Sequence, residues 1–351
     1  MQLIQKLPAG PLDLIGDVHG EIDALVRLLK KLGYDSAGTH PEGRNLVFLG
    51  DLTDRGPDSP AVLSLVKRLV ETTEARCIAG NHELNLMRDA QKHGNEWWTQ
   101  PSATPRLPAK RIDPDERPEF LAFLKTLPLA LERGDLRVVH ASWNTPAIAE
   151  VRARRNDGFD VLGLYAEAEA HLDRYWHDGP GAEAIRAERT GLALKLTDRD
   201  HLPPMLPAQA RKDVAYQMKN PVRTLTAGEE APAAKPFWAG GRWRMVQRVK
   251  WWQDYDDSPP VIVGHYWRRY TSAPSVLADK YGPDLFHGTE PQHWMGKRRN
   301  VYCVDFSVGG RAEQRHAGQP ESHCQLAALR VPEWQVVHDD GETWDIGEPG
   351  T

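Results

Sequence analysis

Short apolar runs alternate with amphipathic stretches over the first part of the chain. Residues 22–32 and 62–70 carry apolar side chains at the spacing of helices with one buried face. Ser59 is predicted to cap the second helix, with Pro60 in the first helical position. The runs between them are predicted to form three buried strands: Leu12–Ile15, Leu46–Leu49 and Arg76–Ala79. This βαβαβ order predicts a sheet of buried strands that collects ligands at the strand ends.

Strand-like runs recur in the second part of the chain. A helix is predicted at Phe120–Leu127, and a strand at Leu136–Val139 ends at His140. After a long interruption, Val261–Val263 resumes the pattern and ends at Gly264-His265. Later runs are predicted to be closing strands of a second sheet: Asn300–Phe306, Gln325–Arg330 and Trp334–His338.

The regular alternation fails between about Thr145 and Ser258. Ala166–Trp176 and Ala182–Leu194 have helical patterns, and prolines and an aromatic, basic stretch follow them. We therefore predict a core of residues 1–144 and 259–351, with residues 145–258 as an inserted cap. A Pro-, Trp- and Arg-rich stretch at 93–118 is expected to form a long loop over the strand ends.

Composition sets limits on the function. The chain has 351 residues, enough for one large domain or for a core with an insertion. Its 44 Lys and Arg against 49 Asp and Glu give a net charge of −5, so the chain as a whole lacks the excess positive charge that is typical of nucleic-acid-binding proteins. The three cysteines form no zinc pattern, and no signal peptide or membrane helix is predicted. We expect a cytoplasmic protein with no membrane partner.

Three polar blocks carry the chemistry, and each follows an apolar run directly. They are Gly16-Asp17-Val18-His19-Gly20, then residues 50–56 (Gly-Asp-Leu-Thr-Asp-Arg-Gly), then Gly80-Asn81-His82-Glu83. Gly-Asp and Gly-Asn pairs are also common in ordinary strand-to-helix turns, and one block alone would fit that explanation. Three blocks in order, presenting carboxylate, imidazole and amide groups, fit a hydrolytic site with two metal ions.

These blocks resemble those of the calcineurin-like metallophosphoesterases, in the phosphoprotein phosphatase branch. That branch includes bacterial-type serine/threonine phosphatases and diadenosine tetraphosphate hydrolases. The resemblance is clear over residues 12–92 and absent from most of residues 145–258. It implies an α/β fold of the metallophosphatase type, which is a four-layer αββα sandwich of two mixed sheets, here with an inserted cap.

The resemblance also implies two divalent metal ions. Manganese is the first expectation, with iron or zinc as alternatives, since the ligands include no thiolate. The first ion is expected at Asp17 and His19, and Asp51 is expected to bridge both ions. Asn81, His140 and His265 are expected to complete the second site. His140 and His265 each follow a strand-like run, as the earlier ligands do, although a histidine ending a strand is often only a hydrogen-bonded core residue.

Catalytic and substrate-binding roles follow from the same resemblance. Arg55 is expected to hold two phosphate oxygens, and Asn81 to lie beside them. His82 is expected to protonate the leaving oxygen, with Asp54 orienting its imidazole, while a metal-bridging hydroxide attacks phosphorus directly. Arg223 and Arg268 are candidates for a second phosphate-binding cation, against the alternative that both are solvated surface residues.

Three functions remain open on the sequence. Asp54, Arg55 and His82 favour a phosphomonoesterase of the phosphoprotein phosphatase type, acting on a phosphoprotein or small phosphoester. Ala79 and the sequence Ala141-Ser142-Trp143 depart from the eukaryotic-type pattern and weaken the protein-substrate assignment. A nucleotide phosphoanhydride, such as a diadenosine tetraphosphate, or an RNA end is the second possibility. A non-catalytic phosphate-binding scaffold is the third, and the intact ligand set argues against it.

The aromatic, basic stretch at 235–253 motivates the nucleotide alternative. It has five basic residues and no acidic one, with tryptophans interleaved, so it offers base stacking and phosphate attraction. An amphipathic strand explains the same pattern without a ligand. In that interpretation Trp243, Met245 and Trp251 lie on one face, with Arg244 and Arg248 on the other. We favour the strand, so nucleic acid is a possible but not a favoured partner.

Overall fold

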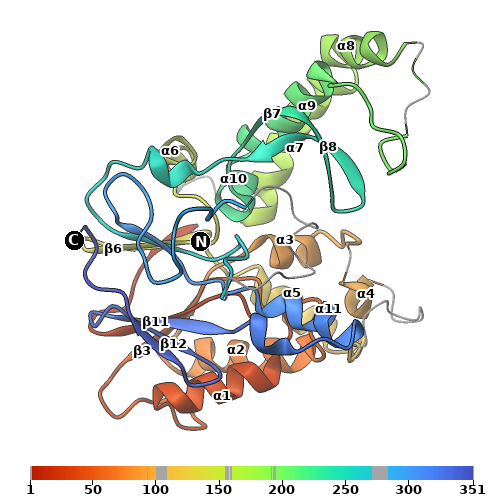
Figure 1. The fold of residues 1–351 in the computed structure, drawn as a ribbon. Helices are drawn as coiled ribbons and strands as arrows, with labels where there is room; N and C mark the ends of the chain where they lie inside the picture. Colours follow the sequence, from red (N-terminus) through yellow and green to blue (C-terminus); the bar gives the residue numbers. More distant parts are fainter. Residues whose placement is uncertain are drawn as a thin grey trace.

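The computed structural model describes residues 2–92, 94–99, 109–154, 158, 160–190, 192, 195–270 and 284–350. Two mixed sheets flanked by helices form the core, and a helical lobe projects from it (Figure 1). This arrangement confirms the predicted α/β fold class. Among the described helices, none combines the length and the apolar character that crossing a bilayer needs.

One sheet has six strands, in the order β13-β12-β11-β2-β3-β4. The strands β2, β3 and β4 are parallel neighbours, as a βαβαβ unit requires. The strands β11, β12 and β13 extend the sheet in antiparallel order. The bounds are β2 Leu12–Ile15, β3 Asn45–Phe48, β4 Arg76–Cys77, β11 Ala327–Val331, β12 Gln335–His338 and β13 Thr343–Asp345.

The other sheet has five strands, in the order β1-β5-β6-β9-β10. Their bounds are β1 Ile4–Lys6, β5 Ala130–Arg133, β6 Leu136–Val139, β9 Val261–Val263 and β10 Val301–Cys303. The prediction that all three closing strands share one sheet is wrong. The strand β10 pairs in parallel with β9, with Val301 opposite Val261, whereas β11 and β12 join the six-stranded sheet.

An apolar layer joins the two sheets. Leu12 and Leu14 of β2 and Val47 of β3 share one buried cluster with Leu131 of β5 and Val138 of β6. Ile15 of β2 and Leu46 and Phe48 of β3 face the helices instead and belong to a second cluster. Burial on both faces explains why these strands are mostly apolar in the sequence. The exception is Asp13 of β2, a buried carboxylate that accepts hydrogen bonds from Tyr34, Arg44 and Arg330.

Helices α1 (Ile22–Leu32) and α2 (Ser59–Thr72) cover the outer face of the six-stranded sheet (Figure 1). The N-cap of α2 is Asp58 rather than the predicted Ser59, because the Asp58 carboxylate accepts a hydrogen bond from the Ala61 N–H. The remaining helices of the core are α3 Asn81–Met87, α4 Glu96–Thr99, α5 Arg117–Leu124, α11 Arg311–His316, and the 3₁₀ turns η2 Val308–Gly310 and η3 Glu321–His323.

The segment predicted as a cap lies between β6 and β9, which are paired neighbours. Its elements are α6 Thr145–Ala153, α7 Val161–Trp176, α8 Pro180–Arg189, α9 Pro207–Met218, α10 Pro221–Ala227, β7 Glu230–Ala239, β8 Arg242–Arg248 and the 3₁₀ turn η1 Trp251–Gln253. Helices α8 and α9 extend away from the sheets (Figure 1). Leu206, Ala210, Met245 and Val246 form a small apolar cluster of their own in this lobe.

The aromatic, basic stretch forms the hairpin β7–β8 and then leaves it. The alternating pattern predicted a strand that runs on through Trp251, but β8 ends at Arg248. Met245 and Val246 are both buried, so burial does not alternate strictly along the strand. Trp251 and Trp252 lie in η1 and pack into the main core. Their rings are therefore not available to stack on bases.

Candidate metal centre

The three polar blocks come together at one edge of the six-stranded sheet. Asp17 and His19 follow β2, Asp51 follows β3, and Asn81 and His82 open α3 after β4. Because the three strands are parallel neighbours, their carboxyl ends deliver these side chains to one place. The sequence folds in this way locally because each apolar strand is followed at once by glycine and a short polar residue.

The two later histidines approach from the five-stranded sheet. His140 follows β6 and His265 follows β9, and these strands are parallel neighbours. The centroids of the two imidazole rings are 5.2 Å apart. The Nε2 of His140 lies 3.3 Å from an oxygen of Asp51, which belongs to the other sheet. The candidate centre therefore bridges the two sheets.

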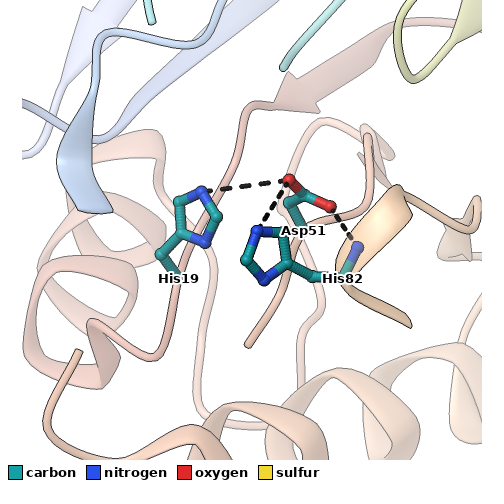
Figure 2. A group of neighbouring side chains, drawn as sticks. All are labelled: His19, Asp51 and His82. Carbon is teal, nitrogen blue, oxygen red and sulfur yellow. Dashed lines mark hydrogen bonds and ion pairs between the residues drawn. The ribbon is translucent and has the colours of Figure 1, made fainter. Parts of the chain in front are cut away.

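Asp51 lies at the middle of this group. Figure 2 shows one oxygen of its carboxylate facing a ring nitrogen of His19 and a ring nitrogen of His82. Its Oδ2 is 3.9 Å from Nε2 of His19 and 3.8 Å from Nε2 of His82. Asp17 is close by, with its Oδ2 at 3.8 Å from Nε2 of His19.

Two groups of side chains have the spacing of metal ligands, and they share Asp51. One is His19, Asp51 and His82, and the other is Asp51, His140 and His265. In each group the ligand atoms all lie within 4.8 Å of one another. A shared carboxylate between two such groups is the arrangement that a dinuclear site requires.

Unpaired buried atoms support metal binding independently. Among the described residues, Oδ1 of Asn81 and Nε2 of both His140 and His265 are buried without a hydrogen-bond partner. An unsatisfied buried acceptor is costly, and a bound metal ion would satisfy each of these atoms. The donor set of carboxylates, imidazoles and an amide suits manganese, iron or zinc. The residues present therefore fit a pair of divalent ions.

Backbone acceptors set the direction of two imidazoles. Nδ1 of His140 lies 2.6 Å from the Leu49 carbonyl, and Nδ1 of His19 lies 3.0 Å from the Thr53 carbonyl. A carbonyl only accepts, so each Nδ1 carries the proton and each Nε2 is left as the ligand atom.

Several residues of the centre have left-handed backbone conformations. The φ angles are 46° at both His19 and Asp51, 74° at Asp54, 71° at Arg55 and 68° at His265. Such values cost free energy in residues other than glycine, and they are concentrated at functional sites. The strain therefore supports a functional interpretation of these loops.

The buried charges also distinguish the centre. Burial and the neighbouring Asp305 carboxylate raise the pKa of Asp17 well above its usual value. Burial acts the same way at Asp51, but the imidazoles of His140 and His82 outweigh it and hold the pKa of Asp51 well below its usual value. Burial lowers the pKa of His140, yet the Asp51 carboxylate raises it to about 10. Shifts of both signs in one cluster are typical of functional sites.

His82 is paired with Asp54. Its Nδ1 lies 2.5 Å from Oδ2 of Asp54, and the other carboxylate oxygen accepts a 2.7 Å hydrogen bond from the Trp97 indole. Asp54 and Trp97 are both buried. The carboxylate thus has a fixed position from which it orients the imidazole.

Arg55 lies beside His19. Its Nη1 donates a 2.6 Å hydrogen bond to Nε2 of His19, and its guanidinium carbon is 4.5 Å from the ring centroid of Trp267. The backbone N–H of Arg55 donates to the Gly94 carbonyl at 3.1 Å. A cation held beside the candidate ligands is suited to binding a phosphate group.

Sequence reasoning missed the positioning roles of three residues. The buried Glu83 carboxylate accepts hydrogen bonds from the N–H groups of Asp51, Leu52 and Gly80, at 2.8, 2.8 and 2.9 Å. Asp305 accepts from the N–H of Trp267, two residues after His265. Glu83 was visible inside the third polar block, and Trp97 lies in the stretch predicted to loop over the site. No local pattern marks Asp305.

The two candidate second cations are not at the centre. Arg268 is 1% exposed, and its guanidinium donates to the carbonyls of Cys303, Glu290 and His293. It was not predicted to be buried, and we assign it a structural role. Arg223 lies in α10, where Glu169 accepts two hydrogen bonds from its guanidinium. Neither arginine is the solvated surface residue of the alternative interpretation.

Comparisons with known proteins agree with this geometry. Residues 10–194 match the calcineurin-like phosphoesterase family. A bis(5'-nucleosyl)-tetraphosphatase PrpE [asymmetrical] of Oceanobacillus iheyensis is 40% identical over 179 residues, covering 47% of this chain and 70% of the relative. The protein of the same name from Bacillus velezensis is 38% identical over 144 residues, covering 37% of this chain and 55% of the relative. The chain thus spans about half the length of some of the curated relatives that it matches.

Solved structures give distant matches. A cold-active protein-tyrosine phosphatase of a psychrophilic Shewanella species has 14% identity and a TM-score of 0.49. That match covers 99% of this chain and 83% of the other. The family match extends over more than half of the present sequence and includes the three polar blocks and His140. The chain belongs to the calcineurin-like phosphoesterase family.

Proposed function

We propose that this chain is a hydrolase that depends on two divalent metal ions and cleaves a phosphoanhydride bond of a nucleotide. A bis(5'-nucleosyl) tetraphosphate is the representative substrate. The observation that carries the proposal is the pair of ligand groups that share Asp51, with unpaired acceptors of Asn81, His140 and His265 around it. The names of the relatives support the substrate class.

In this proposal the six ligands have the roles that the family resemblance implies. Asp17 and His19 would hold one ion, Asn81, His140 and His265 would hold the other, and Asp51 would be shared between them. When bound, two such ions polarise phosphoryl oxygens and lower the pKa of water, and manganese is our first expectation. His82 lies in the same ligand-like group as His19, so its position also suits contact with an ion or with the substrate.

Arg55 binds and orients the phosphate that is attacked. Its guanidinium lies beside His19 and packs over the Trp267 ring. A planar cation of this kind holds two phosphate oxygens at once and offsets charge that develops on them. The Asn81 amide lies at the start of α3, where it faces the same phosphate.

His82 transfers a proton to the group that leaves. Water forms a new bond to phosphorus as the bond between phosphorus and the bridging oxygen breaks. The protonated His82 imidazole gives its proton to that oxygen, and the proton released by the attacking water restores the one that His82 gave, through solvent. Asp54 keeps the imidazole in place through the 2.5 Å contact. The Trp97 indole in turn holds the Asp54 carboxylate.

A phosphomonoester is the second candidate substrate. The close contact between Asp54 and His82 favours it, because an alkoxide leaving group needs a proton donor more than a phosphate leaving group does. This was the first interpretation of the sequence. The tetraphosphatase relatives favour the phosphoanhydride instead.

Product analysis tests the proposal. Manganese-loaded protein is incubated with diadenosine tetraphosphate in ¹⁸O-labelled water, and the nucleotide products are separated and identified by mass spectrometry. We expect two nucleotide products whose phosphate groups sum to four, with ¹⁸O in only one of the two. Turnover of p-nitrophenyl phosphate or a phosphopeptide with an inert dinucleotide would favour the second candidate. If metal-loaded protein hydrolyses none of these substrates, the non-catalytic phosphate-binding scaffold is the interpretation that remains.

A further inference from the structure

Arginines follow one face of the strand β8 in the inserted segment. Arg242, Arg244 and Arg248 are separated by even numbers of residues, so they share one face of the strand. All three are partly exposed. Within the described part of the chain, none of the three has an ion pair, and the buried Nε of Arg242 has no hydrogen-bond partner.

Two cations of the core, Arg88 and Lys92, lie close to this face. Arg88, directly after α3, lies 4.1 Å from the centroid of the Tyr165 ring. Arg223 of α10 lies 5.2 Å from the centroid of the same ring. Lys92 lies four residues beyond Arg88. Burial lowers the pKa of Lys92, and so do the charges of Arg88, Arg223, Arg244 and Arg242. We name Arg88, Lys92, Arg242, Arg244 and Arg248 the basic tract.

The acidic groups nearby are too few to neutralise the basic tract. Glu169 is already bound by Arg223. Two further carboxylates act on Arg244: Glu230, which is paired opposite Arg248 in the hairpin, and Asp213 of α9. Burial raises the pKa of each, so their negative charge is costly where they lie. The cations Arg242 and Arg248 also act on Arg244, so three positive charges lie close together along β8.

Both ends of the basic tract lead to the metal centre. Arg248 lies 5.8 Å from the centroid of the Tyr266 ring, and Tyr266 follows His265 directly. At the other end, Lys92 is two residues before Gly94, whose carbonyl accepts the backbone N–H of Arg55. The tract thus joins the side of the centre that holds His265 to the side that holds Arg55.

We propose that the basic tract is a subsite for the phosphates of the substrate that are not attacked, so that it selects substrates with a chain of several phosphates. This inference rests on the proposed function. Arg55 holds the phosphate at the metal centre, and the arginines of β8 hold the next phosphates along the chain. Guanidinium groups suit this role because they bind phosphate oxygens bidentately and always carry charge.

The test compares a phosphate chain with a single phosphate. Binding of tripolyphosphate and of orthophosphate to the manganese-loaded protein is measured by calorimetry, for the natural protein and for a variant with Arg242→Gln and Arg244→Gln. We expect the variant to lose at least about tenfold in affinity for tripolyphosphate relative to orthophosphate, as loss of charge-assisted hydrogen bonds predicts. The ratio of kcat/KM for diadenosine tetraphosphate to that for p-nitrophenyl phosphate is expected to fall by a similar factor.

Matched controls separate this role from a structural one. Arg186→Gln removes an exposed arginine of α8, and it should leave both ratios unchanged. The pair Arg242→Lys and Arg244→Lys keeps the charges and should recover part of the selectivity. Equal loss of affinity for tripolyphosphate and orthophosphate would overturn the proposal, as would unchanged ratios in a variant with the natural melting temperature.

Two outcomes keep this inference distinct from the proposed function. If diadenosine tetraphosphate is inert but tripolyphosphate still binds through Arg242 and Arg244, the subsite is correct and the proposed substrate is wrong. If a 5'-hydroxyl oligoribonucleotide binds through these arginines and tripolyphosphate does not, the tract is a nucleic-acid surface and the subsite proposal fails.

Discussion

The strand-end loops of the core and the hairpin β7–β8 both gather charged side chains, but they hold them differently. In the core, His19 and His140 are fixed by backbone carbonyls, and Glu83 accepts hydrogen bonds from three backbone N–H groups. In the hairpin, Arg242 and Arg248 have no ion pair within the described residues. Metal ligands need fixed directions, whereas a flexible phosphate chain needs mainly positive charge. The contrast predicts large, specific losses from changes in the loops and graded losses from changes in the hairpin.

The largest loss is expected from Asp51→Asn. The amide keeps the shape of the side chain, but it removes the charge shared by the two ligand groups. We expect turnover to fall by at least about a thousandfold on every substrate. Metal content, measured by mass spectrometry of the purified protein, should fall below two ions per chain. Natural metal content and turnover in this variant would contradict the shared role of Asp51.

The next largest effect is expected from His82→Gln. Loss of the proton donor should reduce kcat by about a hundredfold. The loss should be greater for p-nitrophenyl phosphate analogues with poorer leaving groups, because those depend more on protonation. Steady-state kinetics over a series of aryl phosphates measure this slope. If the loss is the same along the whole series, His82 serves the metal centre rather than the leaving group.

A smaller effect is expected from Trp97→Phe. The variant keeps an aromatic side chain, with a smaller ring, but removes the indole N–H that donates to Asp54. We expect kcat to fall by about tenfold, since a hydrogen bond to a charged group is lost. Trp98→Phe is the matched control, because the neighbouring indole has no hydrogen-bond partner among the described residues. Equal losses in the two variants would mean that aromatic packing, not the bond to Asp54, is responsible.

The smallest expected effect is a loss of folding stability of the core at acid pH. Burial lowers the pKa of His338 to about 4, although Asp339, Asp340 and Glu342 oppose it, and the Tyr270 ring packs on it. Below pH 6.5 the unfolded chain binds a proton at this histidine and the folded chain does not. Stability is therefore lost as the pH falls from 6.5 towards 4, by about 1 kcal/mol at pH 5.5.

Urea unfolding at pH 7.5 and pH 5.5 measures this effect. His338→Phe should remove about 1 kcal/mol of the difference between the two pH values. His316→Gln, at an exposed position of α11, is the control and should leave the difference as it is. If the stability of His338→Phe depends on pH as strongly as that of the natural protein, groups other than His338 cause the dependence.

The sequence predicted the strands that carry the candidate ligands because each is a short, mostly apolar run followed by a polar residue, in most cases after a glycine. It did not predict that β10 leaves β11 and β12 for the other sheet, since strand pairing depends on residues far apart in the chain. The candidate ligands were predictable for the same local reason. The structure brings His19, His82, His140 and His265 together around Asp51. Their roles as metal ligands or catalytic groups stay predictions.

The positions that the sequence did not predict depend on tertiary packing. Arg268 looks like a surface cation in the sequence, yet three carbonyls and the rings of Tyr302 and Phe286 enclose it. Trp97 gains its role only because the 94–99 segment folds back onto Asp54. Local patterns do not encode such contacts, so the positioning residues became visible only in the fold.

The pairing of β6 with β9 has a consequence for how this molecule can change. The strands that end in His140 and His265 are hydrogen-bonded to each other, although the whole inserted segment separates them in the sequence. The chain therefore departs from the core and rejoins it at adjacent points. Changes of length in the distal lobe therefore need not displace the strands that end in His140 and His265, because the two points where the chain leaves and rejoins the core are held together by the β6–β9 pairing.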